Sequence, residues 1–289
     1  TQASNLEVQC DGAGNTAQLN AWLASNGGAV ASDVCSNVTW TNNFASVSDT
    51  CGATGSATVT FTATDNCGNA STTSATFTII DDTDPTITTQ ASNLEVQCDG
   101  AGNTAQLNAW LASNGGAVAS DVCSNVTWTN NFASVSDTCG ATGSATVTFT
   151  ATDNCGNTST TSATFTIIDD TDPTITTQAS NLEVQCDGNG NTAQLNAWLA
   201  SNGGAVASDV CSNVTWTNNF ASVSDTCGAT GSATVTFTAT DNCGNASTTS
   251  ATFTIIDDTD PTITTQASNL EVQCDGAGNT AQLNAWLAS

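Results

Sequence analysis

The chain has 289 residues, with 26 acidic side chains and no Lys, Arg or His, and so carries a formal net charge of −26. Because neutralising phosphates requires Lys or Arg, this composition excludes nucleic-acid binding and opposes binding to an anionic membrane surface. Tyr is absent too, so most general acids, general bases and electrophilic groups are missing from the catalytic inventory. We therefore expect no enzymatic activity.

The sequence repeats itself every 88 residues. The segment TQASNLEVQCDG begins at Thr1, Thr89, Thr177 and Thr265. A unit of this length holds a small sandwich core, which covalent cross-links would stabilise substantially. Repetition at such a period is typical of a tandem array of one domain type, and we interpret the chain as a window onto a longer array.

A short strand and a short helix open the first repeat. The run LEVQC alternates apolar and polar residues, which predicts the strand. In the following run, TAQLNAWLAS, Leu19, Trp22 and Leu23 recur at helical spacing. Asn15 is placed to cap the start of this helix, and Gly27 to follow its end. We expect one short amphipathic helix per repeat, with Trp22 on its core-facing side.

The rest of the repeat is predicted to be β-structure. Val38 and Trp40 mark a strand in NVTWTNNF, and ATVTFTAT, beginning at Ala57, alternates strictly. The turn residues DNCGN then lead into STTSATFTII, so these two runs predict an antiparallel hairpin. The fold class is therefore all-β, with tandem Ig-like β-sandwich repeats of 88 residues, each with one short inserted α-helix, arranged head to tail as an elongated rod.

Repeat boundaries are predicted at three prolines, Pro85, Pro173 and Pro261, each of which follows the acidic run Asp-Asp-Thr-Asp. The residues after each proline are predicted to form the opening strand of the next unit. The expected domains are 1–84, an Ig-like repeat lacking its first strand, 85–172 and 173–260, two further repeats, and 261–289, the N-terminal part of another.

Each repeat holds four cysteines, Cys10, Cys35, Cys51 and Cys67 in the first, and this regular even count predicts disulfides formed in an oxidising, extracellular compartment. Cys51 and Cys67 bracket one extended strand, so at roughly 3.3 Å per residue they lie far beyond the ~6 Å Cα separation that a disulfide tolerates. Excluding that pair excludes Cys10–Cys35 and leaves two sets. A hairpin between Thr86–Thr88 and the next strand would favour one set. Its pairs are Cys10–Cys67, Cys35–Cys51, Cys98–Cys155, Cys123–Cys139, Cys186–Cys243 and Cys211–Cys227.

Acidic residues crowd where one repeat is expected to meet the next. Carboxylate, amide and backbone oxygens are the ligands that Ca²⁺ takes, typically about six to eight of them. Calcium here would stiffen the array and relieve repulsion among the carboxylates. The alternative is a solvated linker beside an ordinary turn, since no EF-hand or RTX pattern is present. The candidate ligands are Asp81, Asp82, Asp84, Asp153, Asn154, Asp169, Asp170, Asp172, Asp241 and Asn242.

The run TATDNCGN, followed by a Thr-rich strand, an acidic linker and DPTI, resembles the hyalin-repeat class of Ig-like modules. With VQCDG, NAWLASNGG and ASDVCSNVTW, the whole unit is similar to repeats of giant cell-surface adhesins of gliding Bacteroidota, of the SprB type. This resemblance covers all 289 residues. It implies type IX secretion, a cell-surface location anchored at the outer membrane by regions outside this chain, and roles in adhesion and gliding motility.

We predict that the chain is a structural extender, or stalk, of a large secreted cell-surface adhesin. Its expected partners are neighbouring repeats, an extracellular surface or glycan ligand reached through a distal domain outside this chain, and, from the resemblance, the gliding machinery. Two other functions stay open. One is a self-assembling surface-layer or filament subunit. The other is a carbohydrate- or ice-binding module, and for ice binding the outward threonines Thr58, Thr60, Thr62 and Thr64 resemble a flat ice-binding face.

Overall fold

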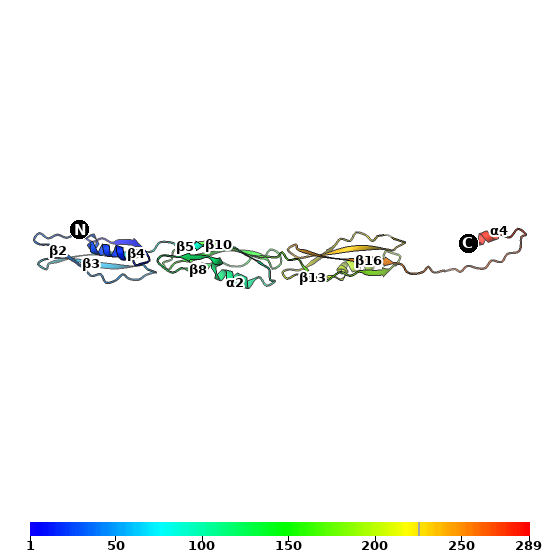
Figure 1. Ribbon diagram of the computed structural model, residues 1–289, viewed down its shortest axis with the longest axis horizontal. Coiled ribbons are helices and arrows are strands. Elements are labelled where there is room, and N and C mark those ends of the chain that lie inside the picture. The colour runs from blue at the N-terminus through cyan, green and yellow to red at the C-terminus, as the bar shows by residue number, and fades with distance from the viewer. Residues whose placement is uncertain (225) are drawn as a thin grey trace. The chain divides into compact units, whose positions relative to one another are not determined.

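The computed structural model describes residues 1–224 and 226–289 (Figure 1). No helix in this described part is long and apolar enough to cross a membrane. The chain divides into two compact bodies. The first comprises Thr1–Gln178, Ala205–Thr217 and Phe237–Thr249, and the second comprises Ala179–Gly204, Asn218–Thr236 and Ser250–Ser289.

The first repeat is built on a four-stranded sheet of order β1-β4-β3-β2. Its strands are β1 (Leu6–Gln9), β2 (Val38–Asn42), β3 (Gly55–Asp65) and β4 (Ala70–Ile80). Strands β3 and β4 form the predicted antiparallel hairpin, whereas β1 pairs in parallel with β4. The predicted alternation is confirmed, since Val59, Phe61 and Phe77 are fully buried in the core.

Helix α1 (Thr16–Ala24) lies against this sheet, as the blue ribbon in Figure 1 shows, and a 3₁₀ turn, η1 (Asn26–Gly28), follows it. The Trp22 ring is buried and meets Phe61 edge-on, with centroids 5.2 Å apart. The predicted helix and its apolar face are thus confirmed. Gly27 has a φ of 64°, and a Cβ there would lie 3.0 Å from the Phe61 ring, so this turn requires glycine.

Asn15 occupies the expected N-cap position of the helix, but its side chain does not cap it. It adopts a left-handed conformation, with φ at 51°, and its side chain makes no cap hydrogen bond. The side chain is instead fully buried, donating to the Gln9 carbonyl at 2.7 Å and accepting from the Asp11 amide at 3.2 Å. Asn15 therefore fixes the loop between β1 and α1.

The second repeat has a four-stranded sheet of the same kind, of order β6-β10-β9-β8, and a separate two-stranded sheet of β5 and β7. Its elements are β5 (Thr86–Thr89), β6 (Leu94–Gln97), α2 (Thr104–Ala112), η2 (Asn114–Gly116), β7 (Val118–Ser120), β8 (Thr127–Asn130), β9 (Gly143–Thr152) and β10 (Thr158–Ile168). The helix and the two-stranded sheet form the second layer. The repeat is thus a two-layer, β-sandwich-type domain with one short helix, as predicted.

The third repeat follows the same plan, with sheets β12-β16-β15-β14 and β11-β13. A final helix, α4, follows at Thr280–Leu287. The elements of the third repeat are β11 (Thr174–Thr177), β12 (Leu182–Gln185), α3 (Thr192–Ala200), η3 (Asn202–Gly204), β13 (Val206–Ser208), β14 (Thr215–Asn218), β15 (Gly231–Thr240) and β16 (Ala246–Ile256).

The expected hairpin between Thr86–Thr88 and the next strand does not form. Strand β5 pairs with β7, with Ile87 opposite Ala119, and β6 joins β10 in parallel. The residues between β5 and β6 cross from one layer to the other, and their backbone groups form hydrogen bonds with partners outside the expected hairpin. The Ala91 amide, for example, donates to the Thr161 hydroxyl of β10 at 3.1 Å.

Candidate functional site at the junctions between repeats

Disulfide bonds join the first repeat to the second and the second repeat to the third. Cys10–Cys123 and Cys51–Cys155 link the first repeat to the second, with Cα separations of 6.0 and 5.2 Å. All four junction disulfides lie within the first compact body. The pairs that link the second repeat to the third are Cys98–Cys211 and Cys139–Cys243.

The pairings expected within a repeat are therefore wrong, and the parallel strand β1 explains why. Cys10 follows β1 and donates its amide to the Ile80 carbonyl at 2.8 Å, so it lies where β4 ends. Cys67 lies in the turn where β4 begins, an entire strand length away. The pairs that do not form are Cys10–Cys67, Cys35–Cys51, Cys98–Cys155, Cys123–Cys139, Cys186–Cys243 and Cys211–Cys227.

Five cysteines have no disulfide partner among the described residues. Cys35 and Cys67 in the first repeat are the counterparts of Cys123 and Cys155, which bond backward to the preceding repeat. Cys186 and Cys227 in the third repeat are the counterparts of Cys10 and Cys51, which bond forward. The five free cysteines are Cys35, Cys67, Cys186, Cys227 and Cys274.

Backbone contacts reinforce each junction. The Ala53 amide donates to the Cys123 carbonyl at 2.8 Å, and the Asn157 side chain donates to the Asp81 carbonyl at 3.1 Å. Gly52 has a φ of +58°, and a Cβ there would lie 2.5 Å from the Cys123 carbonyl oxygen. The close approach of the next repeat therefore requires glycine at this position.

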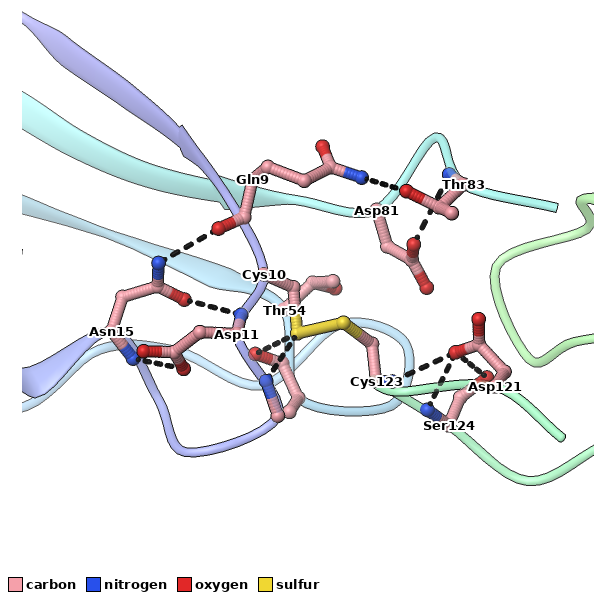
Figure 2. The surroundings of a disulfide bond; sticks show 12 residues. Gln9, Cys10, Asp11, Asn15, Thr54, Asp81, Thr83, Asp121, Cys123 and Ser124 are labelled. Carbon is pink, nitrogen blue, oxygen red and sulfur yellow. Dashed lines mark hydrogen bonds between the residues drawn. A yellow bond between two sulfur atoms is a disulfide. The ribbon is translucent and has the colours of Figure 1, made fainter. Parts of the chain in front are cut away.

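Among the acidic residues of the linker, Asp81 lies closest to the Cys10–Cys123 disulfide. Its carboxyl group faces Asp121 (Figure 2). One oxygen of Asp81 accepts from the Thr83 amide at 3.3 Å, while Oδ2 is buried without a hydrogen-bond partner. One oxygen of Asp121 accepts from the amides of Cys123 and Ser124. Burial raises the pKa of Asp81, and the neighbouring charges of Asp121 and Asp153 raise it further.

Ligand-type atoms of Asp81, Asp121 and Cys123 lie within 4.8 Å of one another, and Asp169, Asp209 and Cys211 repeat the cluster at the next junction. Each cluster could hold a metal ion. Because Cys123 and Cys211 are in disulfides, their sulfurs are not thiolates, and thiolate is the cysteine form that binds metals. The metal-binding chemistry of each cluster therefore rests on two carboxylates, which suits a hard cation.

The remaining candidate ligands are held differently. Asp84 accepts from the Thr158 amide at 3.1 Å across the junction, while Asp82 and Asn154 are exposed. The Asp153 carboxylate is buried and accepts from the amides of Cys155, Gly156 and Asn157 and from the Asn157 side chain. Burial acts to raise the pKa of Asp153, but these hydrogen bonds outweigh it and lower the pKa. Its oxygens are thus occupied by its own turn.

The second junction places the equivalent residues in the same way. Asp169 has a buried, unpartnered Oδ2 and a pKa raised by burial, and Asp241 is held in its own turn. Asp172 accepts from the Ala246 amide at 3.1 Å. Asp170 and Asn242 are exposed.

Sequence reasoning missed Asp121 and Asp209. Each stands two residues before a cysteine that bonds backward to the preceding repeat. The Asp-x-Cys spacing was visible in the sequence, but it gains meaning only when the disulfide partner is known. The counterpart in the first repeat, Asp33, accepts from the Cys35 and Ser36 amides and acts as a turn residue.

No protein-family model and no curated protein matches the chain. Among solved structures, "Structure of mouse clustered PcdhgC3 EC1-3" is 11% identical, with a TM-score of 0.26, and the match covers 71% of this chain and 77% of that chain. Human CDH23 EC21-23 is 15% identical at a TM-score of 0.26, with 68% and 73% covered. The human Desmocollin-1 ectodomain is 11% identical at a TM-score of 0.22, with 70% and 47% covered. Similarity at this level assigns neither a family nor a function.

Proposed function

We propose that this chain is a non-catalytic structural extender of a cell-surface adhesin. The observation that carries the proposal is the coupling of the first three repeats, by two disulfides at each of their two junctions and by backbone hydrogen bonds such as Ala53 to Cys123. A spacer must keep neighbouring domains in register while a distal domain binds its target. Two covalent bonds per junction serve that role better than a linker peptide alone.

Cell adhesion and gliding motility follow from the resemblance to SprB-type repeats, as do secretion by the type IX route and anchoring at the outer membrane. In this proposal the chain contacts only its neighbouring repeats. A distal domain outside this chain binds the extracellular surface or glycan, and the gliding machinery acts on the anchored end. The absence of basic residues is consistent with this division, since the repeats would not adhere to anionic surfaces.

Small-angle scattering with light scattering on the oxidised chain, its free thiols alkylated, tests the extender role. A compact globule of this length would have a radius of gyration of about 19 Å. We expect a monomer with a radius well above that value. A compact particle, or sheets and bundles that grow with concentration, would contradict an extender.

In this proposal Ca²⁺ binds at the junction between repeats. The buried, unpartnered oxygen of Asp81 supports this site. A cation between Asp81 and Asp121 would satisfy this oxygen and neutralise two facing carboxylates. The wild type should then bind Ca²⁺ in calorimetry and unfold at a higher temperature when Ca²⁺ is present.

A pair of charge-matched variants makes this test specific. The double variant Asp81→Asn/Asp169→Asn should lose the Ca²⁺ response, and Asp82→Asn/Asp170→Asn, which removes two exposed carboxylates, should keep it. An equal response in both would place the bound calcium elsewhere. No response in the wild type would contradict calcium binding at the junction.

A self-assembling filament subunit is the second candidate, and disulfide exchange between chains would test it. Cys35 and Cys67 occupy the positions that bond backward elsewhere, and Cys186 and Cys227 those that bond forward. Under glutathione disulfide, a filament subunit would form a ladder of covalent multimers on a non-reducing gel, and Cys35→Ser/Cys67→Ser would abolish it. A chain that stays monomeric under these conditions rules this candidate out.

A further inference from the structure

The junction disulfides also create a short covalent route through the second repeat. Cys139 bonds forward to Cys243 and Cys155 bonds backward to Cys51, and these two cysteines of the second repeat lie only 16 positions apart. A chain of covalent bonds therefore runs from the first repeat to the third through 16 residues of the 88 in between.

The structure points to a mechanical role for this route, which rests on the proposed extender function. We propose that the two 16-residue segments that meet at Cys139, Cys123–Cys139 and Cys139–Cys155, together with their disulfides, bear tension along the array and limit how far a repeat lengthens under load. The linker Asp81–Asp84 and strand β10 are not part of this route.

The Cys139–Cys155 segment is already extended in the folded repeat. Strand β9 makes up ten of its residues and rises about 3.3 Å per residue, close to the maximum of about 3.6 Å for a fully extended chain. It is an inner strand of its sheet, hydrogen-bonded to β10 on one side and β8 on the other. Val147 and Phe149, which point from it into the core, are fully buried. Little slack is therefore available before the route becomes taut.

Short hydrogen-bonded turns attach both ends of β9 to the disulfides. At one end the Thr142 amide donates to the Cys139 carbonyl at 3.2 Å, and the Thr142 hydroxyl donates to the same carbonyl at 2.6 Å. At the other end the Asp153 carboxylate accepts from the Cys155 amide at 2.8 Å. A load entering through either sulfur thus reaches β9 through only a few residues.

A second route of equal length leaves Cys139 in the other direction. Cys123 lies 16 positions before Cys139 and bonds backward to Cys10. Both routes thus connect the junction disulfides on one side of the repeat to Cys139. Disulfides within a repeat would have left the linker peptide as the sole covalent connection between neighbours, so this mechanical property depends on the pairing across repeats.

Single-molecule stretching of the full chain, held at both termini with its free thiols alkylated, tests the proposal. The shortest covalent path runs from Thr1 to Cys10, from Cys123 to Cys139 and from Cys243 to Ser289, roughly 70 residues or ~250 Å when extended. The reduced chain should reach about 1,000 Å, a fourfold greater length. Release of a whole repeat, about 300 Å in one step, from the oxidised chain would overturn the proposal.

Two variants at the same junction provide a matched control. Cys139→Ser/Cys243→Ser cuts both 16-residue routes, leaving a path through Cys98–Cys211 of roughly 110 residues, so the limit should rise about 1.6-fold. Cys98→Ser/Cys211→Ser also removes one disulfide but leaves the shortest path intact, so its limit should not change. Equal limits in the two variants would overturn the proposed path.

Mass spectrometry of the remaining disulfides confirms that each variant has folded with its other pairs in place. The stretching result is separate from the extender role. A chain with the predicted limits that nevertheless forms sheets, or binds glycans itself, would contradict the extender role and leave the tension-bearing path standing.

Discussion

Residues 1–25 and 265–289 have the same sequence but different surroundings. In the first segment both β1 and α1 form, and Trp22 is 6% exposed. In the second, the helix forms again as α4, but the residues that correspond to β1 are not a strand, and Trp286 is 37% exposed. The comparison separates what this sequence forms locally from what requires the rest of a repeat.

The helix and the preceding loop are local. The Leu19 amide donates to the Asn15 carbonyl at 2.9 Å, and the Leu283 amide donates to the Asn279 carbonyl at 3.0 Å. Asn279 also holds the Gln273 carbonyl at 2.7 Å, as Asn15 holds Gln9. The strand is not local, because its hydrogen-bond partners lie in β4, about 70 residues further along the chain.

Replacing the tryptophan should produce the largest difference between the two segments. We expect Trp22→Ala to lower the free energy of unfolding by about 3–5 kcal/mol, because it opens a cavity against Phe61 and Phe77. Trp286→Ala should change it by less than about 1 kcal/mol. Urea unfolding of the oxidised chain, followed by circular dichroism, measures both. Equal losses would mean that Trp286 is also packed in a core.

The cysteines extend the comparison to the junction, since Cys10 is disulfide-bonded and Cys274 is free. We expect Cys10→Ser/Cys123→Ser to cost about 2–4 kcal/mol, because the unfolded chain regains the freedom that the closed loop removed. Cys274→Ser should leave stability unchanged. The same urea titration, with remaining free thiols alkylated, measures both. A loss of stability in Cys274→Ser would show that the Cys274 side chain stabilises the fold although it forms no disulfide.

The buried asparagine gives a smaller difference. Asn15→Ala leaves the Gln9 carbonyl and the Asp11 amide without their buried partner, so we expect a loss of about 2 kcal/mol in the free energy of unfolding. Asn279→Ala should leave global unfolding within about 0.5 kcal/mol, because that loop is more exposed. It should instead reduce hydrogen-exchange protection at the start of α4. If both substitutions lowered the free energy of unfolding by a similar amount, burial of the asparagine would not determine the size of the loss.

The sequence predicted the features that depend on short-range patterns. The alternation around Phe61 and Phe77 identified the β3–β4 hairpin, and the helical spacing of Leu19 and Trp22 identified α1 with its buried face. A threefold repetition of the same pattern gave the repeat period. For the hairpin and the helix, the residues that decide the element lie within one or two turns or strands of one another.

The features that the sequence did not predict depend on partners. Alternation in LEVQC identifies a strand, but not that it runs parallel to β4, and this direction determines at which end of the repeat Cys10 lies. Near-identical repeats also give a cysteine the same sequence surroundings in its own repeat and in the next, so local pattern cannot show that Cys10 pairs with Cys123 and Cys51 with Cys155 of the next repeat. Asp121 was missed for the same reason.

The smallest expected effect is a pH response that the two segments share. Hydrogen bonds from the amides of Asn15 and Ala13 lower the pKa of Asp11, and those of Ala277 and Asn279 lower the pKa of Asp275. A carboxyl with a lowered folded-state pKa contributes stability above its unfolded pKa, and this contribution is lost as the pH falls through the folded value. Both loops should therefore loosen in acid, below the ordinary Asp value of 3.8.

Carbon-detected NMR titration of the carboxyl groups tests whether the pKa values of Asp11 and Asp275 are both lowered. Asp11 and Asp275 should both titrate below the ordinary value, whereas Asp81, with its raised pKa, should titrate above it. The contribution of Asp81 has the opposite sign, since it is present below the unfolded pKa and is lost as the pH rises through the folded one. If Asp275 titrated at the ordinary value while Asp11 remained low, the loop would depend on the core of the repeat, and only the helix would remain a local structure of this sequence.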